Sequence, residues 1–139
     1  MTQEISLDPR LASDSTAIGR LSLCEVRLQD DARFPWLVLV PQREGMSELF
    51  ELSFSDRAAA IEEVAQCAAA LRAVTQCLKI NVGALGNIVR QLHIHVVARN
   101  EGDAAWPGPV WGVGTRVPYS ETEKSDLIAR LRSALAMHR

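Results

Sequence analysis

The stretch that decides the fold lies between Asn81 and Val97. It reads Asn81-Val-Gly-Ala-Leu-Gly-Asn87, then Ile-Val-Arg, then Gln91-Leu-His-Ile-His-Val-Val97. Apolar and polar side chains alternate from Leu92 to Ala98, which predicts a β-strand. Successive side chains of a strand point to opposite faces, so we expect Gln91, His93 and His95 to share one face. The other face of this strand would then pack against helices.

The rest of the chain supplies the remaining elements of an α+β fold. Alternation predicts a strand within Ala17–Leu28, and the apolar run Trp36–Val40 predicts a buried central strand that ends at Pro41. A helix of about five turns is expected to begin at Ser55, which would cap it. Its predicted apolar stripe is Ala58, Ile61, Val64, Ala65, Ala68, Leu71 and Val74. Strand character returns at 77–82 before the glycine turn, and a second amphipathic helix is expected over 120–138. The order strand, strand, helix, strand, strand, helix predicts an antiparallel sheet.

Length and composition restrict the class of protein. The 139 residues are enough for one domain, 1–139, but too few for two domains that each have a core of ordinary size. The net charge of -2 implies no cationic face, so neither nucleic acid nor an anionic membrane is the expected partner. The three cysteines are odd in number and form no CxxC pair, which predicts free thiols in a reducing, cytoplasmic location. No apolar stretch is long enough to span a membrane.

The paired histidines allow three interpretations. The simplest is a solvent-facing sheet surface that happens to carry two imidazoles. The second is a metal site, although zinc needs further ligands and none of the cysteines adjoins this strand. The third is nucleophilic catalysis at phosphorus, in which a neutral imidazole attacks while donors hold the anionic oxygens. Asn81, Gly83, Gly86 and Asn87 lie just before the histidines and favour the third interpretation.

The segment from Asn81 to Trp111 resembles the signature of the histidine triad (HIT) superfamily. The resemblance rests on the asparagine, the glycine-rich turn, the Gln91-x-His93-x-His95-x-x pattern and the Trp106-Pro-Gly segment that follows. It implies a HIT-like fold: an antiparallel sheet of about five strands with one long helix and a C-terminal helix. It also implies a nucleotidyl hydrolase or transferase, similar to diadenosine polyphosphate hydrolases such as the diadenosine tetraphosphate enzymes, that is commonly a homodimer.

The resemblance assigns expected roles to individual residues. His93 matches the middle histidine, which carries the nucleotidyl intermediate, and His95 matches the third. Asn81 matches a polar contact on the phosphate side, and Asn87 matches a neighbouring glutamine more loosely. The nucleotide-binding candidates are Asn81, Gly86, Asn87, Arg99 and Trp106. Arg99 could clamp a phosphate or be a solvated strand-end arginine; Trp106 and Trp111 could stack on a base or pack across a dimer interface.

Two departures from the family pattern affect the expected chemistry. The first triad position is Gln91, which can orient a ligand or a ring but cannot titrate near neutral pH. After Pro41 the chain carries Gln42, Arg43 and Glu44 where many members carry a histidine. A phosphoramidate needs its leaving amine protonated, whereas a phosphoanhydride leaves as a stable anion. We therefore expect a preference for dinucleoside polyphosphates, with no required cofactor although Mg²⁺ could neutralise substrate phosphates.

Two rival functions accompany the hydrolase hypothesis. A nucleotide-binding sensor or adaptor would keep the pocket and lose turnover through the changes at Gln91 and Glu44. A metal-dependent enzyme is the third possibility. The partner in the first two cases is a nucleotide, and the sequence does not identify its base.

Overall fold

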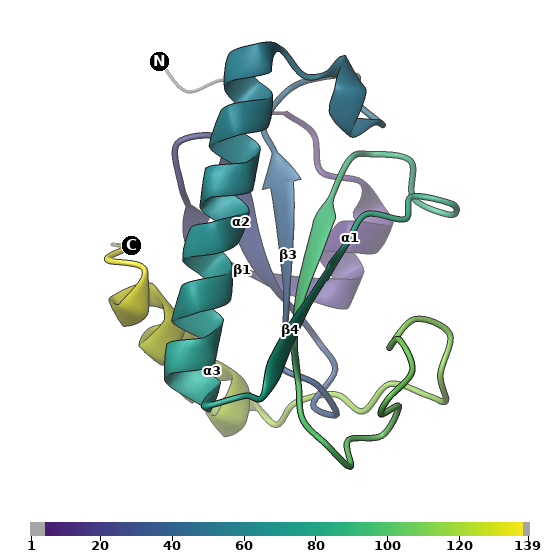
Figure 1. Cartoon of the computed structure of the whole chain (residues 1–139), viewed down its shortest axis with the longest axis vertical. Coiled ribbons are helices and arrows are strands. Elements are labelled where there is room, and N and C mark those ends of the chain that lie inside the picture. The colour runs from purple at the N-terminus through teal and green to yellow at the C-terminus, as the bar shows by residue number, and fades with distance from the viewer. Residues whose placement is uncertain (1–4, 138–139) are drawn as a thin grey trace.

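The computed structural model describes residues 5–137. Its elements are α1 (Pro9–Asp14), β1 (Ser15–Arg20), β2 (Cys24–Gln29), β3 (Trp36–Pro41), η1 (Leu49–Glu51), α2 (Phe54–Thr75), β4 (Lys79–Gly83), β5 (Ile94–Arg99) and α3 (Glu121–Ala134). The five strands form one sheet in the order β1-β2-β3-β5-β4, and every neighbouring pair is antiparallel. The expected α+β class with an antiparallel sheet is therefore confirmed (Figure 1).

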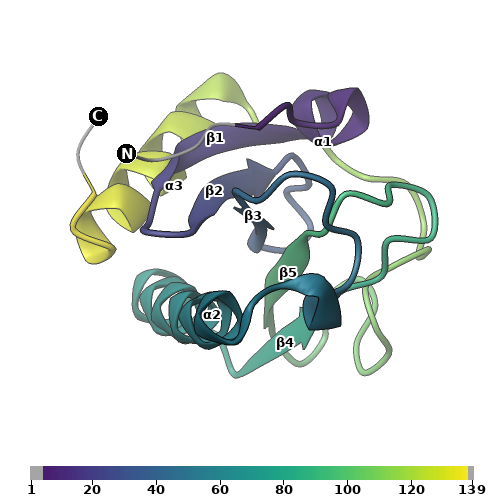
Figure 2. The same cartoon turned by 90° about the horizontal axis from the view of Figure 1, so that it is seen from above.

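The two faces of the sheet are covered by different parts of the chain. Helices α2 and α3 lie on one face, the helix face, and α1 with the long loops lies on the other (Figure 2). Strand β3 shows the consequence, because Leu37 and Leu39 join the core under the helices while Trp36, Val38 and Val40 join a second core. Burial on both sides explains the continuous apolar run of this strand. We call the second face, which carries His95, the site face.

Two expected boundaries in the first half of the chain were wrong. The segment expected as one strand, Ala17–Leu28, forms two, because the chain reverses at residues 21–23. Glu63 of α2, 5% exposed, stabilises this reversal by accepting the backbone N–H groups of Leu23 and Cys24 at 2.9 and 2.8 Å. The cap of α2 is Ser53 rather than Ser55, since the Ser53 hydroxyl accepts from the N–H of Asp56.

The buried stripe of α2 also differs from the expected one. Ala58 and Ala65 are exposed and Ile61 is 61% exposed. The buried residues are Ala60, Glu63, Val64, Cys67, Ala70 and Leu71. Cys24, Cys67 and Cys77 are all buried free thiols, as predicted. Burial raises the pKa of the Cys67 thiol to about 12 and raises that of Cys24 as well.

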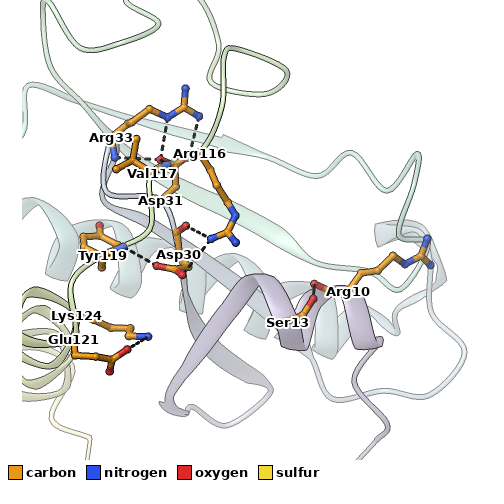
Figure 3. A network of polar contacts seen from close by, with 10 residues as sticks. All are labelled: Arg10, Ser13, Asp30, Asp31, Arg33, Arg116, Val117, Tyr119, Glu121 and Lys124. Atoms are coloured by element: carbon orange, nitrogen blue, oxygen red, sulfur yellow. Dashed lines mark hydrogen bonds and ion pairs between the residues drawn. The ribbon is translucent and has the colours of Figure 1, made fainter.

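The long segment between β5 and α3 is held to the β2–β3 turn by two aspartates. Asp30 accepts the backbone N–H of Tyr119 at 2.9 Å and pairs with Arg116, as Figure 3 shows. Asp31 accepts the N–H of Val117 and is held by Arg33. This network fixes the end of the segment that carries Trp111 across the site face.

Within residues 5–137, no helix combines the length and the apolar character needed to cross a membrane.

Candidate active site

His93 and His95 lie side by side at the start of β5. The strand begins at Ile94 rather than at Leu92, so Gln91 and His93 precede it. The two imidazole rings still meet, with their centroids 4.9 Å apart. Leu92, Ile94 and Val96 point into the core under the helices, as expected. Both histidines are nearly covered, at 7% and 8% exposure, which argues against a simple solvated sheet surface.

A backbone hydrogen bond fixes the tautomer of the neutral His93 ring. Its Nδ1 lies 2.7 Å from the carbonyl oxygen of Gln91. A carbonyl oxygen can only accept, so Nδ1 carries the hydrogen. In the neutral ring, Nε2 then keeps its lone pair free, which is the form that a nucleophile at phosphorus requires.

His95 is held in the opposite tautomer by Trp36. The indole N–H of Trp36 donates to Nδ1 of His95 at 2.9 Å. Because Nδ1 accepts, the hydrogen of the neutral ring is on Nε2, which can donate to a ligand. Burial, with a smaller contribution from His93, lowers the pKa of His95 to about 4, so the ring stays neutral near pH 7. The pair therefore offers one free lone pair and one N–H donor.

The side-chain amide of Gln91 bonds two backbone groups of the segment before α1. Its amide oxygen accepts the N–H of Asp8 at 2.7 Å, and its amide nitrogen donates to the carbonyl of Ser6 at 3.0 Å. These bonds hold the Gln91 side chain toward the segment before α1, which packs on the same face of the sheet as Trp36 and Val38. The residue contributes its backbone carbonyl to His93, while its side chain ties down the segment that leads into α1.

A cavity of about 170 Å³ opens beside His93. The loop before η1 and the turn after β4 form its walls, and its lining includes Glu48, Phe50, Gly86 and Gln91. Gly86 has a φ of 72°, which a glycine adopts without strain. Asn87 is exposed beside this turn. The cavity is too small for a whole nucleotide but admits part of one.

Trp111 covers the other side of the site. Its ring centroid lies 5.5 Å from that of His95 and 6.2 Å from that of Trp36. A side chain at Gly83 would meet the Trp111 ring at 3.0 Å, so this position needs glycine for the indole to lie where it does. Sequence reasoning singled out Trp111 but missed Trp36, whose contact with His95 depends on the pairing of β3 with β5.

Arg99 is neither a solvated arginine nor a free phosphate clamp. It is 1% exposed and forms two hydrogen bonds to Asp103, at 2.8 and 3.0 Å, and a third to Asn81 Oδ1 at 2.9 Å. These bonds from Arg99 lower the pKa of Asp103 to about 2. The Arg99 guanidinium also lies 5.7 Å from the Trp106 ring centre. Three of the expected nucleotide contacts, Asn81, Arg99 and Trp106, thus form an internal cluster.

The residues after Pro41 also have internal partners. Gln42 is buried, and its amide bonds Arg20 and the carbonyl of Val40. Arg43 pairs with Asp56 at 2.7 Å. Glu44 is exposed. In the part of the chain that the structure describes, no three histidine, cysteine, aspartate or glutamate side chains gather closely enough to hold a metal ion.

Comparisons with known proteins agree with this geometry. The family model for the HIT domain matches residues 10–102. A histidine triad protein from Sinorhizobium meliloti 1021 is 52% identical, with 93% of this chain and 96% of that chain covered and a TM-score of 0.91. A second from Bradyrhizobium japonicum is 43% identical (94% and 97% covered, TM-score 0.92), and a third from Marinobacter aquaeolei VT8 is 38% identical (96% and 97% covered, TM-score 0.92). No curated protein matches. With two thirds of its length matched by the family model and close structural relatives over nearly all of it, the chain belongs to the histidine triad family.

Proposed function

We propose that the protein hydrolyses a nucleotide phosphoanhydride, with dinucleoside polyphosphates as the model substrate, through a nucleotidyl intermediate on His93. The HIT family includes nucleotide hydrolases and transferases. The observation that carries the proposal is the hydrogen bond from Nδ1 of His93 to the Gln91 carbonyl. It directs the free lone pair of the ring to Nε2, and Nε2–H of His95 is available nearby as a donor to phosphate.

The proposed reaction has two steps. Nε2 of His93 attacks the α-phosphorus, a P–N bond forms, and the P–O bond to the remaining polyphosphate breaks. The leaving group departs as a phosphate anion and needs no proton from the protein. Water then attacks phosphorus, the P–N bond breaks with its electron pair returning to Nε2, and the proton lost by the water passes to solvent. The products from diadenosine tetraphosphate are AMP and ATP.

The absence of a titrating side chain at Gln91 bears on the choice of substrate. A phosphoramidate requires a general acid for its amine, and His95 is held neutral with a pKa of about 4. We therefore expect faster turnover of a dinucleoside polyphosphate than of an adenosine phosphoramidate at equal concentration. Faster phosphoramidate cleavage would contradict this preference.

The decisive experiment compares wild type with His93→Ala. Each is incubated with diadenosine tetraphosphate, quenched in acid-free denaturant, and analysed for intact-protein mass and nucleotide products. We expect a nucleotidyl adduct or AMP release with wild type and neither with His93→Ala. His93→Gly with added imidazole serves as a second variant, since imidazole can replace the missing ring without restoring the covalent adduct.

A second function, nucleotide sensing without turnover, is favoured by one observation. The first motif position, Gln91, cannot titrate near neutral pH and has its side chain bonded to Asp8 and Ser6, so it supplies no proton carrier for turnover. A sensor would bind AMP or a dinucleoside polyphosphate and form no adduct. Binding by calorimetry without adduct or product in the experiment above would establish this alternative.

We also propose that no resident metal is required. Mg²⁺ would act by binding the phosphates of the substrate, since such ions usually keep several waters and few protein ligands. Protein purified without chelator should contain less than one equivalent of metal by elemental analysis. Loss of the His93 adduct after EDTA treatment, with recovery on zinc but not magnesium, would instead support a metal-dependent enzyme.

The homodimer implied by family membership is a further part of the proposal. Strand β4 forms an edge of the sheet, and Val82 on it is 53% exposed. A groove beside this edge is lined by Ala68, Ala69, Arg72, Ala73, Lys79 and Ile80. A second copy that pairs its own β4 with this edge would cover both features. Light scattering after size exclusion should give twice the chain mass, and Val82→Lys should shift it toward the monomer.

A further inference from the structure

The inference starts from an unpaired donor beside the two histidines. Within residues 5–137, Nε1 of Trp111 is the one buried side-chain nitrogen or oxygen that has no hydrogen-bond partner. Buried polar groups in folded proteins nearly always have partners, because an unpaired donor loses its bonds to water and gains none in return. An exception next to a candidate active site suggests a donor kept for a ligand.

The position of the indole relates this donor to the site. Atoms Cη2 and Cζ2 of Trp111 lie nearest to the place where a Gly83 side chain would be, at 3.0 and 3.4 Å. These two atoms belong to the benzo edge of the indole, so this edge packs against the end of β4. Gly83 is paired with His95 across β4 and β5. The Trp111 indole therefore lies beside the His95 ring, and the two ring centroids are 5.5 Å apart.

Of the nearby imidazole nitrogens, only Nε2 of His93 keeps a free lone pair, and Trp111 does not bond it. Nδ1 of His95 already accepts from Trp36, and Nε2 of His95 carries a hydrogen. Nδ1 of His93 is a donor to the Gln91 carbonyl. The site thus presents two N–H donors, from Trp111 and His95, close to one nucleophilic lone pair on His93. Two donors beside a nucleophile suit an anionic oxygen on the atom under attack.

We propose that the indole N–H of Trp111 binds an anionic oxygen of the nucleotide phosphate, together with Nε2–H of His95. The inference rests on the proposed function in that its ligand is a nucleotide, but it requires binding and not turnover. Nε1 is covered in the unliganded protein, so the indole shifts when the phosphate enters. Gly112, with a φ of 79° and open space around its Cα, directly follows Trp111 and can accommodate such a shift.

The test removes the N–H and keeps the ring system. Replacement of Trp111 by 3-benzothienylalanine exchanges the N–H for sulfur in a bicycle of the same shape, and Trp111→Phe is the simpler companion. AMP, adenosine and inorganic phosphate are titrated by calorimetry. We expect AMP to bind about tenfold more weakly to both variants, the size expected for one lost hydrogen bond to a charged oxygen. Adenosine, which lacks the phosphate, should bind all forms equally.

Two controls make the outcome specific. Trp106→Phe alters a tryptophan of the same segment that packs on Arg99, and its AMP affinity should match wild type. In a ¹H–¹⁵N spectrum of wild type, the Trp111 indole proton should move downfield on AMP addition and not on adenosine addition.

Each result decides a different question. AMP affinity of the benzothienyl protein within twofold of wild type would overturn the inference, as would an equal loss for adenosine, which would indicate contact with the nucleoside. If wild type binds no AMP, the nucleotide function itself fails and the role of Trp111 fails with it. Normal AMP binding with no adduct on His93 would contradict the hydrolase and leave the Trp111 donor supported by its own measurement.

Discussion

Trp36 donates its indole hydrogen to Nδ1 of His95 across two paired strands. Trp36 pairs with Val97 and His95 pairs with Val38, so the two side chains are diagonal neighbours on the site face. The bond assigns the hydrogen of the neutral His95 ring to Nε2, while the Gln91 carbonyl assigns that of His93 to Nδ1. The two histidines of the motif therefore adopt opposite tautomers, because one bonds an indole N–H and the other bonds a backbone carbonyl.

Removal of the Trp36 donor should release the tautomer of His95. In Trp36→Phe the ring is retained in part and the N–H is lost, so Nδ1 of His95 becomes free to carry the hydrogen. We expect ¹⁵N shifts that report a mixture of His95 tautomers instead of the single Nε2–H form. Loss of this hydrogen bond and of buried area should reduce the free energy of unfolding by about 1–3 kcal/mol. An unchanged His95 tautomer in Trp36→Phe would show that another group fixes it.

The stability of the protein should depend on pH through His95. The folded-state pKa is about 4 and the ordinary value is 6.5, so the unfolded chain binds the extra proton first as the pH falls. The contribution is fully present above pH 6.5 and is lost progressively down to pH 4, about 3 kcal/mol in all. Urea denaturation at several pH values measures it. His95→Asn, which cannot titrate there, should have a flatter profile over this range.

Gln91 should matter for the segment before α1 more than for the orientation of His93. Gln91→Leu removes both amide bonds, to Ser6 and Asp8, but leaves the carbonyl that holds His93. We expect faster amide exchange over residues 6–14 and a loss of about 1–2 kcal/mol in stability. Gln91→Glu keeps an acceptor for the Asp8 N–H and should be intermediate. Equal exchange in wild type and Gln91→Leu would mean that other contacts hold this segment.

The buried carboxylate of Glu63 should be essential for stability. Glu63→Ala leaves the N–H groups of Leu23 and Cys24 unpaired in the core and should cost about 2–4 kcal/mol of unfolding free energy. Glu62→Ala, one position earlier and exposed, is the matched control and should change stability by no more than about 0.5 kcal/mol. A small effect at Glu63 would imply that the β1–β2 reversal finds other acceptors.

The elements of the fold were predictable because their patterns are local. The β3 run ends at Pro41, and the alternation around His95 marks β5. The buried face of α2 was harder to predict, because alanines occur on every side of this helix. Apolar spacing alone therefore does not separate the exposed Ala58 and Ala65 from the buried Ala60 and Ala70. The cap was misplaced because serine at either Ser53 or Ser55 can cap a helix, and it is the Ser53 hydroxyl that accepts the N–H of Asp56.

The site shows the same division between local and distant information. The proximity of His93 and His95 follows from their spacing, and the structure bears it out. The partners of Gln91 lie 83 and 85 residues earlier in the chain, so the sequence around Gln91 does not predict them. The burial of Arg99 could not be predicted from local sequence, because it depends on contacts with Asp103 and Trp106 beyond the end of β5.

The buried thiols can be used to measure transient unfolding of the native protein. Cys24 and Cys67 have no exposed surface, and burial raises the pKa of both well above neutrality, so neither is a thiolate in the native state. An alkylating reagent can therefore reach these two sulfurs only in molecules that have transiently unfolded around α2. Under native conditions, the rate at which these two thiols are alkylated therefore measures how often this region unfolds.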